Sequence, residues 1–148
     1  MILKFRGFQV RLDDCLSWLE PYIRVANRLG YLKGAFNDRL KEVRGYYVSK
    51  RGIERQQAGC TKTRGRCVIT ILKKTQTYSK SKQGKFRVDG WLDADEEYMF
   101  EQTLDNLAHE IAHIQHWDHS PERHIAEKKL QLAFAKEAKK QGYKGYRD

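Results

Sequence analysis

Four of the chain's five histidines lie in one short segment, HEIAHIQHWDH, which spans residues 109–119. His109 and His113 are four residues apart, so on a helix their imidazoles lie on one side and can bind the same metal ion. Glu110 stands between them, where it can act as a general base without binding the metal. This HExxH spacing predicts a zinc-activated water that attacks a carbonyl carbon. The alternatives are a chance match on a solvated helix and a purely structural zinc site.

A catalytic zinc usually takes three protein ligands, so one more residue should bind it. His116 continues the same helical face, but three ligands on one rigid helix make a poor tetrahedron. His119 leaves that face unless the helix ends first, and Pro121 predicts such an end, because the residue before a proline avoids the helical region. We therefore expect His119 to be the third ligand and keep His116 as the alternative ligand or a neighbouring group. Asp118 is a candidate for orienting a ligand ring, although aspartate is also common in turns.

The helix that carries this segment should begin near Ala94 and bury one side in the core. Its apolar residues step by four, three, four and three positions and form one stripe: Phe100, Leu104, Leu107, Ile111 and Ile114. The histidines lie roughly opposite this stripe, so we expect the helix to expose their imidazoles. Ser120 and Pro121 predict the start of a last helix, which should run to about Gln141 and stop at Gly142.

Shorter elements should precede the histidine helix. Apolar residues at helical spacing predict a helix over 12–29, with Pro21 either starting a second helix or kinking the first. Strands are predicted over 43–48 and 67–72, the latter from the β-branched run CVITIL. The glycine-dotted segment between them is expected to be a loop or an irregular edge, and the polar stretch at 75–88 to be a flexible hairpin.

These elements predict one α+β domain over residues 1–148. It should contain an N-terminal helix, a short and mainly antiparallel sheet, the histidine helix and a C-terminal helix. We expect the core of the domain at about 40–135 and a tail at 142–148.

The net charge of +10 is concentrated in part of the chain, because residues 41–87 hold fourteen Lys and Arg against two acids. Such a basic block can lie along a phosphate backbone and makes DNA a candidate partner. The candidate contact residues are Lys50, Arg51, Arg55, Lys62, Arg64, Arg66, Lys73 and Lys74. The alternative is a solvated basic surface that only aids solubility, since no DNA-reading motif accompanies the charge.

The cysteines and the first residues of the chain indicate the cellular compartment of the protein. The three cysteines show no CxxC pair, so a disulfide framework is not expected, although a Cys60–Cys67 bridge is an alternative. The first fourteen residues show no apolar leader, and no apolar run is long enough for a membrane span. We therefore expect a cytoplasmic protein without membrane contact.

The pattern HExxHxxHxxH, followed by Ser120, Pro121 and Glu122, resembles the active-site segment of the SprT-like metallopeptidases and of the related WLM and YgjP-like proteins. The resemblance implies a small gluzincin-type α+β domain with Zn²⁺ and a third histidine ligand at the place of His119. It also implies that substrate chain lies along a sheet edge, and several such relatives act on proteins bound or cross-linked to DNA. It covers about residues 40–135 and is specific only at 109–121.

The chain departs from this family at several places. Arg123 and His124 stand where the family usually has an aromatic pair, and the zinc ribbon of some relatives is absent. The histidine spacing also matches metzincins, but His116 replaces their turn glycine and no downstream methionine can form a Met-turn. Tyr78 and Tyr98 are candidates for stabilising the oxyanion, although a structural role suits each phenol better.

The sequence thus favours a zinc metallopeptidase that hydrolyses peptide bonds with Glu110 as general base. The expected partners are a protein or peptide substrate, with DNA-associated proteins as candidates. The alternative is a non-catalytic, basic nucleic-acid-binding module with a structural zinc site.

Overall fold

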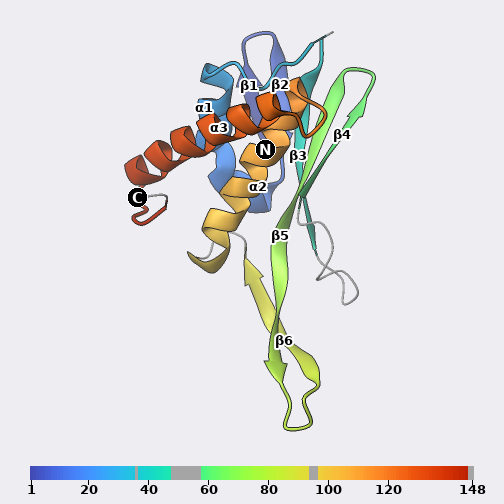
Figure 1. Cartoon of the computed structure of the whole chain (residues 1–148), viewed down its shortest axis with the longest axis vertical. Helices are drawn as coiled ribbons and strands as arrows, with labels where there is room; N and C mark the ends of the chain where they lie inside the picture. Colours follow the sequence, from blue (N-terminus) through green and yellow to red (C-terminus); the bar gives the residue numbers. More distant parts are fainter. Residues whose placement is uncertain (36, 48–57, 94–96, 147–148) are drawn as a thin grey trace.

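Helices on one face of a mixed sheet make up the fold of the computed structural model, which describes residues 1–35, 37–47, 58–93 and 97–146 (Figure 1). Of residues 46–47, 73–79, 86–93 and 97–98 it describes the backbone alone. The elements in chain order are β1 (Ile2–Phe5), β2 (Phe8–Leu12), the 3-10 helix η1 (Asp14–Leu19), α1 (Glu20–Arg28), β3 (Arg39–Tyr47), β4 (Ala58–Thr63), β5 (Arg66–Lys80), β6 (Phe86–Asp93), α2 (Glu97–Gln115) and α3 (Pro121–Lys140).

The strand order in the sheet is β1-β2-β3-β5-β4, and β6 pairs with β5 outside this path. The pairs β2–β3 and β3–β5 are parallel, while β1–β2, β4–β5 and β5–β6 are antiparallel. Three of the five pairings are antiparallel, as expected, but the two central pairings are parallel, so the sheet is mixed. The β2–β3 pair is parallel because η1 and α1 form a crossover between these two strands, and such a connection returns the chain in the same direction.

The first strands were not expected from the sequence. Leu12 ends β2 instead of starting a helix, and Pro21 stands in the first turn of α1, as one of the two expected alternatives has it. Phe5 and Phe8 close the β1–β2 hairpin around Gly7, whose φ of 84° suits a tight turn. The segment expected to be a loop or an irregular edge contains β4, a strand at the edge of the sheet, which forms because its polar residues pair with the apolar start of β5.

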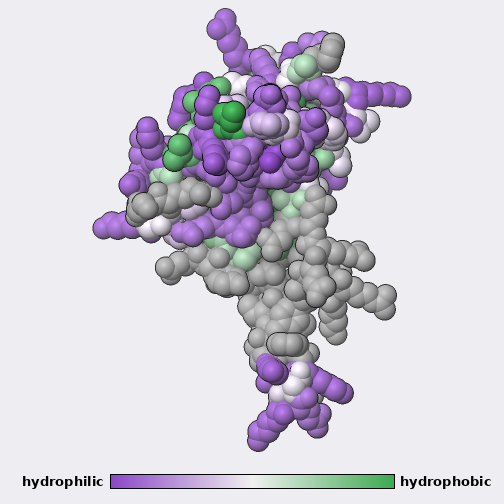
Figure 2. All heavy atoms as spheres, in the orientation of Figure 1, coloured by the Kyte–Doolittle hydropathy of each residue, from purple (hydrophilic) through white to green (hydrophobic). Residues whose placement is uncertain are grey.

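The hairpin of β5 and β6 extends away from the rest of the molecule (Figure 1). It confirms the predicted hairpin, while its flexibility stays a prediction. The turn at 81–85 is fixed by the Ser81 hydroxyl, which accepts a 3.1 Å hydrogen bond from the Lys85 backbone N–H. Figure 2 shows that the tip is hydrophilic, with Lys80, Lys82 and Lys85 exposed.

The core lies between the sheet and the helices. The predicted stripe of α2 faces it, with Leu104, Leu107 and Ile111 fully buried. The core also includes residues outside 40–135, among them Leu3 and Phe8 in the first strands. In the described part of the expected tail, residues 142–146, the Tyr146 hydroxyl donates a 2.7 Å hydrogen bond to Asp105 of α2. Among the described residues, no helix has the length and apolar character needed to cross a membrane.

Candidate metal centre

The last two turns of α2 carry His109, Glu110 and His113 and end at Gln115. The end of the helix is held by the Gln115 side-chain amide, which donates to the carbonyl oxygens of Gly30 (2.8 Å) and Lys33 (2.9 Å). These bonds tie α2 to the loop after α1 and fix the position at which the helix stops. The sequence did not identify this contact, because its partners are far apart along the chain.

The chain then turns, as Pro121 predicts. Ser120 is extended, with φ −76° and ψ 164°, and its hydroxyl accepts a hydrogen bond from the Arg123 backbone N–H as the N-cap of α3. The turn brings His119 back over α2, where its ring centroid lies 5.5 Å from that of His109 and 4.8 Å from that of His113. The predicted change of direction between the two helices is therefore present.

The three rings form a cluster that can hold one metal ion. One ring nitrogen of each of His109, His113 and His119 lies within 4.8 Å of the others. The Nε2 atoms of His109 and His113 are 3.1 Å apart. Two histidine nitrogens on a tetrahedral zinc lie about 3.3 Å apart, given zinc–nitrogen bonds of about 2.05 Å. The His109–His113 pair thus has nearly the spacing that zinc requires.

The other nitrogen of two of these rings already has a partner. His113 Nδ1 lies 3.2 Å from the carbonyl oxygen of His116 and 3.0 Å from that of Trp117. His109 Nδ1 lies 3.2 Å from a carboxylate oxygen of Glu127. A hydrogen on Nδ1 that is donated to these oxygens leaves the lone pair on Nε2, which is the form that binds a metal.

Glu127 and Arg123 come from α3 and were not identified as site residues from the sequence. Arg123 is 6 % exposed, and its Nη1 donates a 2.6 Å hydrogen bond to Glu127. The same Nη1 lies 3.0 Å from His109 Nδ1. Since a guanidinium only donates and a carboxylate only accepts, Arg123 and Glu127 favour opposite tautomers of His109. The only sequence signal was the i,i+4 spacing of Arg123 and Glu127, which is common on helices.

Glu110 lies on the buried side of α2 and is 5 % exposed. Burial raises the pKa of Glu110 to about 7, and the nearby charges of Arg123 and Glu127 lower and raise it, respectively. Burial and the neighbouring His109 both lower the pKa of His113. His113 is only 8 % exposed, so the expectation that α2 exposes its imidazoles is wrong for this ring. The start of α3 supplies Arg123 and Glu127 to this side of α2.

The remaining predicted site residues either lie near the cluster or have side chains that the structure does not describe. The ring of His116 is not among the clustered nitrogens, because α2 has ended and its carbonyl faces His113 instead. Asp118 is exposed and makes no hydrogen bond or ion pair with the part of the chain that the structure describes. Tyr78 lies in the β5–β6 hairpin and Tyr98 in the first turn of α2, and their side chains are outside the described set.

The predicted basic residues that the structure describes, Lys62, Arg64 and Arg66, have different surroundings. Lys62 pairs with the buried Asp38, and its Nζ lies 6.0 Å from the centroid of the Trp117 ring, so it has a structural contact. Arg64 is exposed in the turn between β4 and β5, with φ 51°. Arg66 lies on the outer face of the sheet. Lys50, Arg51 and Arg55 and the side chains of Lys73 and Lys74 lie outside the described residues.

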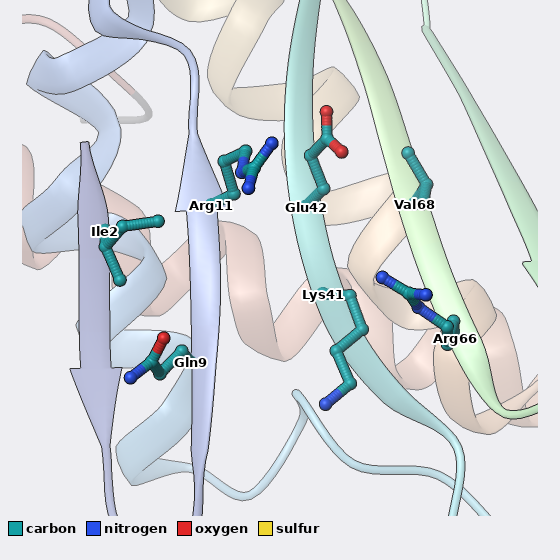
Figure 3. Close-up of a pocket in the computed structure, with 7 residues that line it drawn as sticks. All are labelled: Ile2, Gln9, Arg11, Lys41, Glu42, Arg66 and Val68. Carbon is teal, nitrogen blue, oxygen red and sulfur yellow. The ribbon is translucent and has the colours of Figure 1, made fainter.

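The outer face of the sheet, opposite the helices, has a hollow of about 420 Å³ (Figure 3). Arg11, Lys41 and Arg66 line it from three adjacent strands, and within the described residues none of them has an ion pair. Among the described residues that line it, Glu42 is the one acid. Its hydrogen bond from Arg44, and then the charges of Arg44, Arg11 and Arg66, lower the pKa of Glu42.

No protein-family model, curated protein sequence or solved structure matches this chain. The fold and the cluster therefore stand on their own geometry, and the resemblance to SprT-like metallopeptidases remains an expectation from the sequence.

Proposed function

We propose that this protein is a zinc-dependent metallopeptidase of the SprT-like, zincin kind, in which His109, His113 and His119 hold the metal. The observation that carries the proposal is the cluster of three imidazoles beside a buried carboxylate at HExxH spacing. The donor set fits zinc, since three neutral imidazoles leave one position of a tetrahedron for water or substrate. A zinc ion there would lower the pKa of a water molecule and polarise the carbonyl of a peptide bond.

The protein's own groups would supply the proton transfers and the orientation. Glu110 would take the proton from the attacking water at its carboxylate and return it to the leaving amine nitrogen. Glu127 would accept the Nδ1 hydrogen of His109, and the carbonyls of His116 and Trp117 would accept that of His113. Arg123 would hold Glu127 in place.

The experiment compares the zinc-loaded wild type with Glu110→Gln on an unfolded protein substrate such as casein. Glu110→Gln keeps the shape of the side chain but cannot accept a proton, so it should bind zinc normally and lose at least 99 % of the cleavage, as a loss of roughly 10²-fold or more is typical. A Glu101→Gln variant, altered at an exposed position of the same helix, is the matched control and should cleave normally. Normal cleavage by Glu110→Gln would contradict the proposal.

A second candidate function is nucleic-acid contact through the outer face of the sheet. The supporting observation is that Arg11, Lys41 and Arg66 share one hollow and lack ion pairs among the described residues. Three phosphate contacts predict a slope of about −2 to −3 for log K against log salt concentration.

The test of this second candidate measures binding of a labelled DNA 20-mer at several salt concentrations. Changing Arg11, Lys41 and Arg66 together to glutamine should remove most of the binding and flatten the slope. The control removes three charges from the hairpin tip, at Lys80, Lys82 and Lys85. Loss of binding only in the tip variant would contradict the assignment to the outer face.

A further inference from the structure

A groove of about 560 Å³ separates the end of α1 from the second half of α3, away from the metal cluster. Its apolar lining comes from both helices, with Val25 and Leu29 on one side and Leu132 and Ala133 on the other. Figure 2 shows hydrophobic surface interrupting the hydrophilic surface where these two helices lie. The groove is thus a hollow with an apolar centre on an otherwise polar side of the molecule.

Two large apolar side chains in this groove are in contact with solvent. Leu29 is 50 % exposed and Leu132 is 63 % exposed. Single exposed leucines are normal on a protein surface, but two that line one hollow form a patch that a partner can cover. Val25 and Ala133 are buried or half-buried beneath them, so a partner would meet a preformed apolar floor.

Basic side chains line the same groove. They are Arg28, Lys129, Lys136 and Lys140, all exposed, and none has an ion pair among the residues that the structure describes. Glu137, the one acid among the described lining residues, accepts a 3.0 Å hydrogen bond from Gln141. The lining therefore carries a net charge of about +3, from four cations and one anion, around an apolar centre.

We infer that this groove between α1 and α3 binds an acidic, amphipathic helical segment of a partner protein. Carboxylates on the segment would pair with the basic lining, and its apolar side chains would contact Leu29 and Leu132. An amphipathic helix has an apolar stripe flanked by polar residues, which matches an apolar centre flanked by cations. A nucleic acid would leave the apolar centre uncovered, and a membrane surface requires apolar side chains that project from a convex face.

The groove shares a helix with the candidate metal centre. Nine residues separate Glu127 from Lys136 on α3, which corresponds to about 14 Å along the helix axis. The groove is therefore built on the same helix as the residues that contact His109, without overlapping them. The inference itself does not depend on the metal, because all lining residues are distinct from the cluster.

The test uses a fluorescein-labelled 16-residue peptide with leucines at i, i+3, i+4 and i+7 and glutamates on the flanking positions. Fluorescence anisotropy measures its binding to zinc-loaded and EDTA-treated full-length protein, so a failure of the zinc proposal does not affect the result. A second peptide with the leucines changed to serine has the same charge. We expect micromolar binding of the first peptide and at least tenfold weaker binding of the second.

The protein variants separate charge from apolar contact. Lys129→Glu with Lys136→Glu should weaken binding at least tenfold, and Leu132→Ser at least fivefold. Lys128→Glu and Ile125→Ser are exposed changes on the same helix outside the groove, and should bind within twofold of wild type. The variants alter exposed residues, and circular dichroism checks their fold.

Equal weakening by the controls would overturn the inference, since it would show unspecific charge attraction. The absence of peptide binding would also overturn the inference. So would association with anionic vesicles, or self-association of the protein, that depends on Leu132 when the peptide does not bind. Amide shifts in an NMR titration of the labelled protein should fall on residues 25–31 and 129–140.

Discussion

At the scale of single residues, the contacts behind the imidazoles decide whether the cluster can hold a metal. His109 Nδ1 lies beside both a carboxylate and a guanidinium, and only the carboxylate favours the tautomer with a free Nε2 lone pair. Metal binding would therefore select the contact to Glu127 over the contact to Arg123. This makes Glu127 a positioning residue whose effect should appear in zinc affinity before it appears in any cleavage assay.

Changing Glu127 to glutamine should weaken zinc binding about 10- to 100-fold, because loss of a carboxylate partner of a metal-binding histidine typically has this effect. Competition with a chromophoric chelator measures the dissociation constant directly. Glu122→Gln changes an exposed glutamate in the first turn of the same helix and should leave the constant unchanged. Unchanged zinc affinity in Glu127→Gln would show that His109 is oriented by other groups.

Residue types and spacing predicted His109, Glu110, His113 and His119 as neighbours, because helix geometry and a proline-induced turn are local properties. Arg123 and Glu127 could not be predicted as neighbours of the site. Their contacts depend on how α3 crosses α2, and such tertiary packing is not encoded in the spacing of a short segment.

At the scale of elements, the end of α2 must stay fixed for His113 and His119 to meet. Gln115 holds it from one side, and Gly34 approaches it closely from the same loop. A Cβ added at Gly34 would lie 2.3 Å from the carbonyl oxygen of Ile114, in the last turn of α2. A larger residue there must move either the loop or the helix end.

Gly34→Ala should therefore lower the free energy of unfolding by about 1–3 kcal/mol, as overpacking usually does. Urea unfolding monitored by circular dichroism measures the change. Gly84 offers a comparison, since its added Cβ would have only a lysine side-chain atom at 3.9 Å, although its φ of 79° adds some strain. A wild-type midpoint for Gly34→Ala would mean that the loop moves without cost.

The bounds of α3 and the apolar stripe of α2 followed from caps and periodicity. The sequence signals failed for β1, β2 and β4. These strands are short, and β4 is polar at the edge of the sheet, so they form through pairing with neighbours instead of through their own propensity. The parallel pairing of β2 with β3 likewise depends on the crossover through α1.

At the scale of the whole molecule, the proposed zinc would link α2 to the turn that follows it. Any ligand that binds only the folded state stabilises it by RT ln(1 + [L]/Kd), or about 4 kcal/mol at a thousandfold excess over Kd. Removal of zinc should therefore destabilise the entire domain, because the ligands lie on and after α2, which packs on the core.

We expect EDTA to lower the melting temperature of the wild type by roughly 8–16 °C, given about 2–4 °C per kcal/mol for a domain of this size. Differential scanning calorimetry with and without EDTA measures this shift. A His119→Ala variant, which lacks one proposed ligand, should show a much smaller shift. The same large EDTA effect in both proteins would contradict the proposed ligand set.

The central claim is tested most directly by metal analysis of the purified protein and two histidine variants. We predict one zinc per chain for the wild type and for His116→Ala, and substantially less than one for His119→Ala. A wild type that binds no zinc after gentle purification would contradict the claim. So would a zinc content that depends on His116 and not on His119.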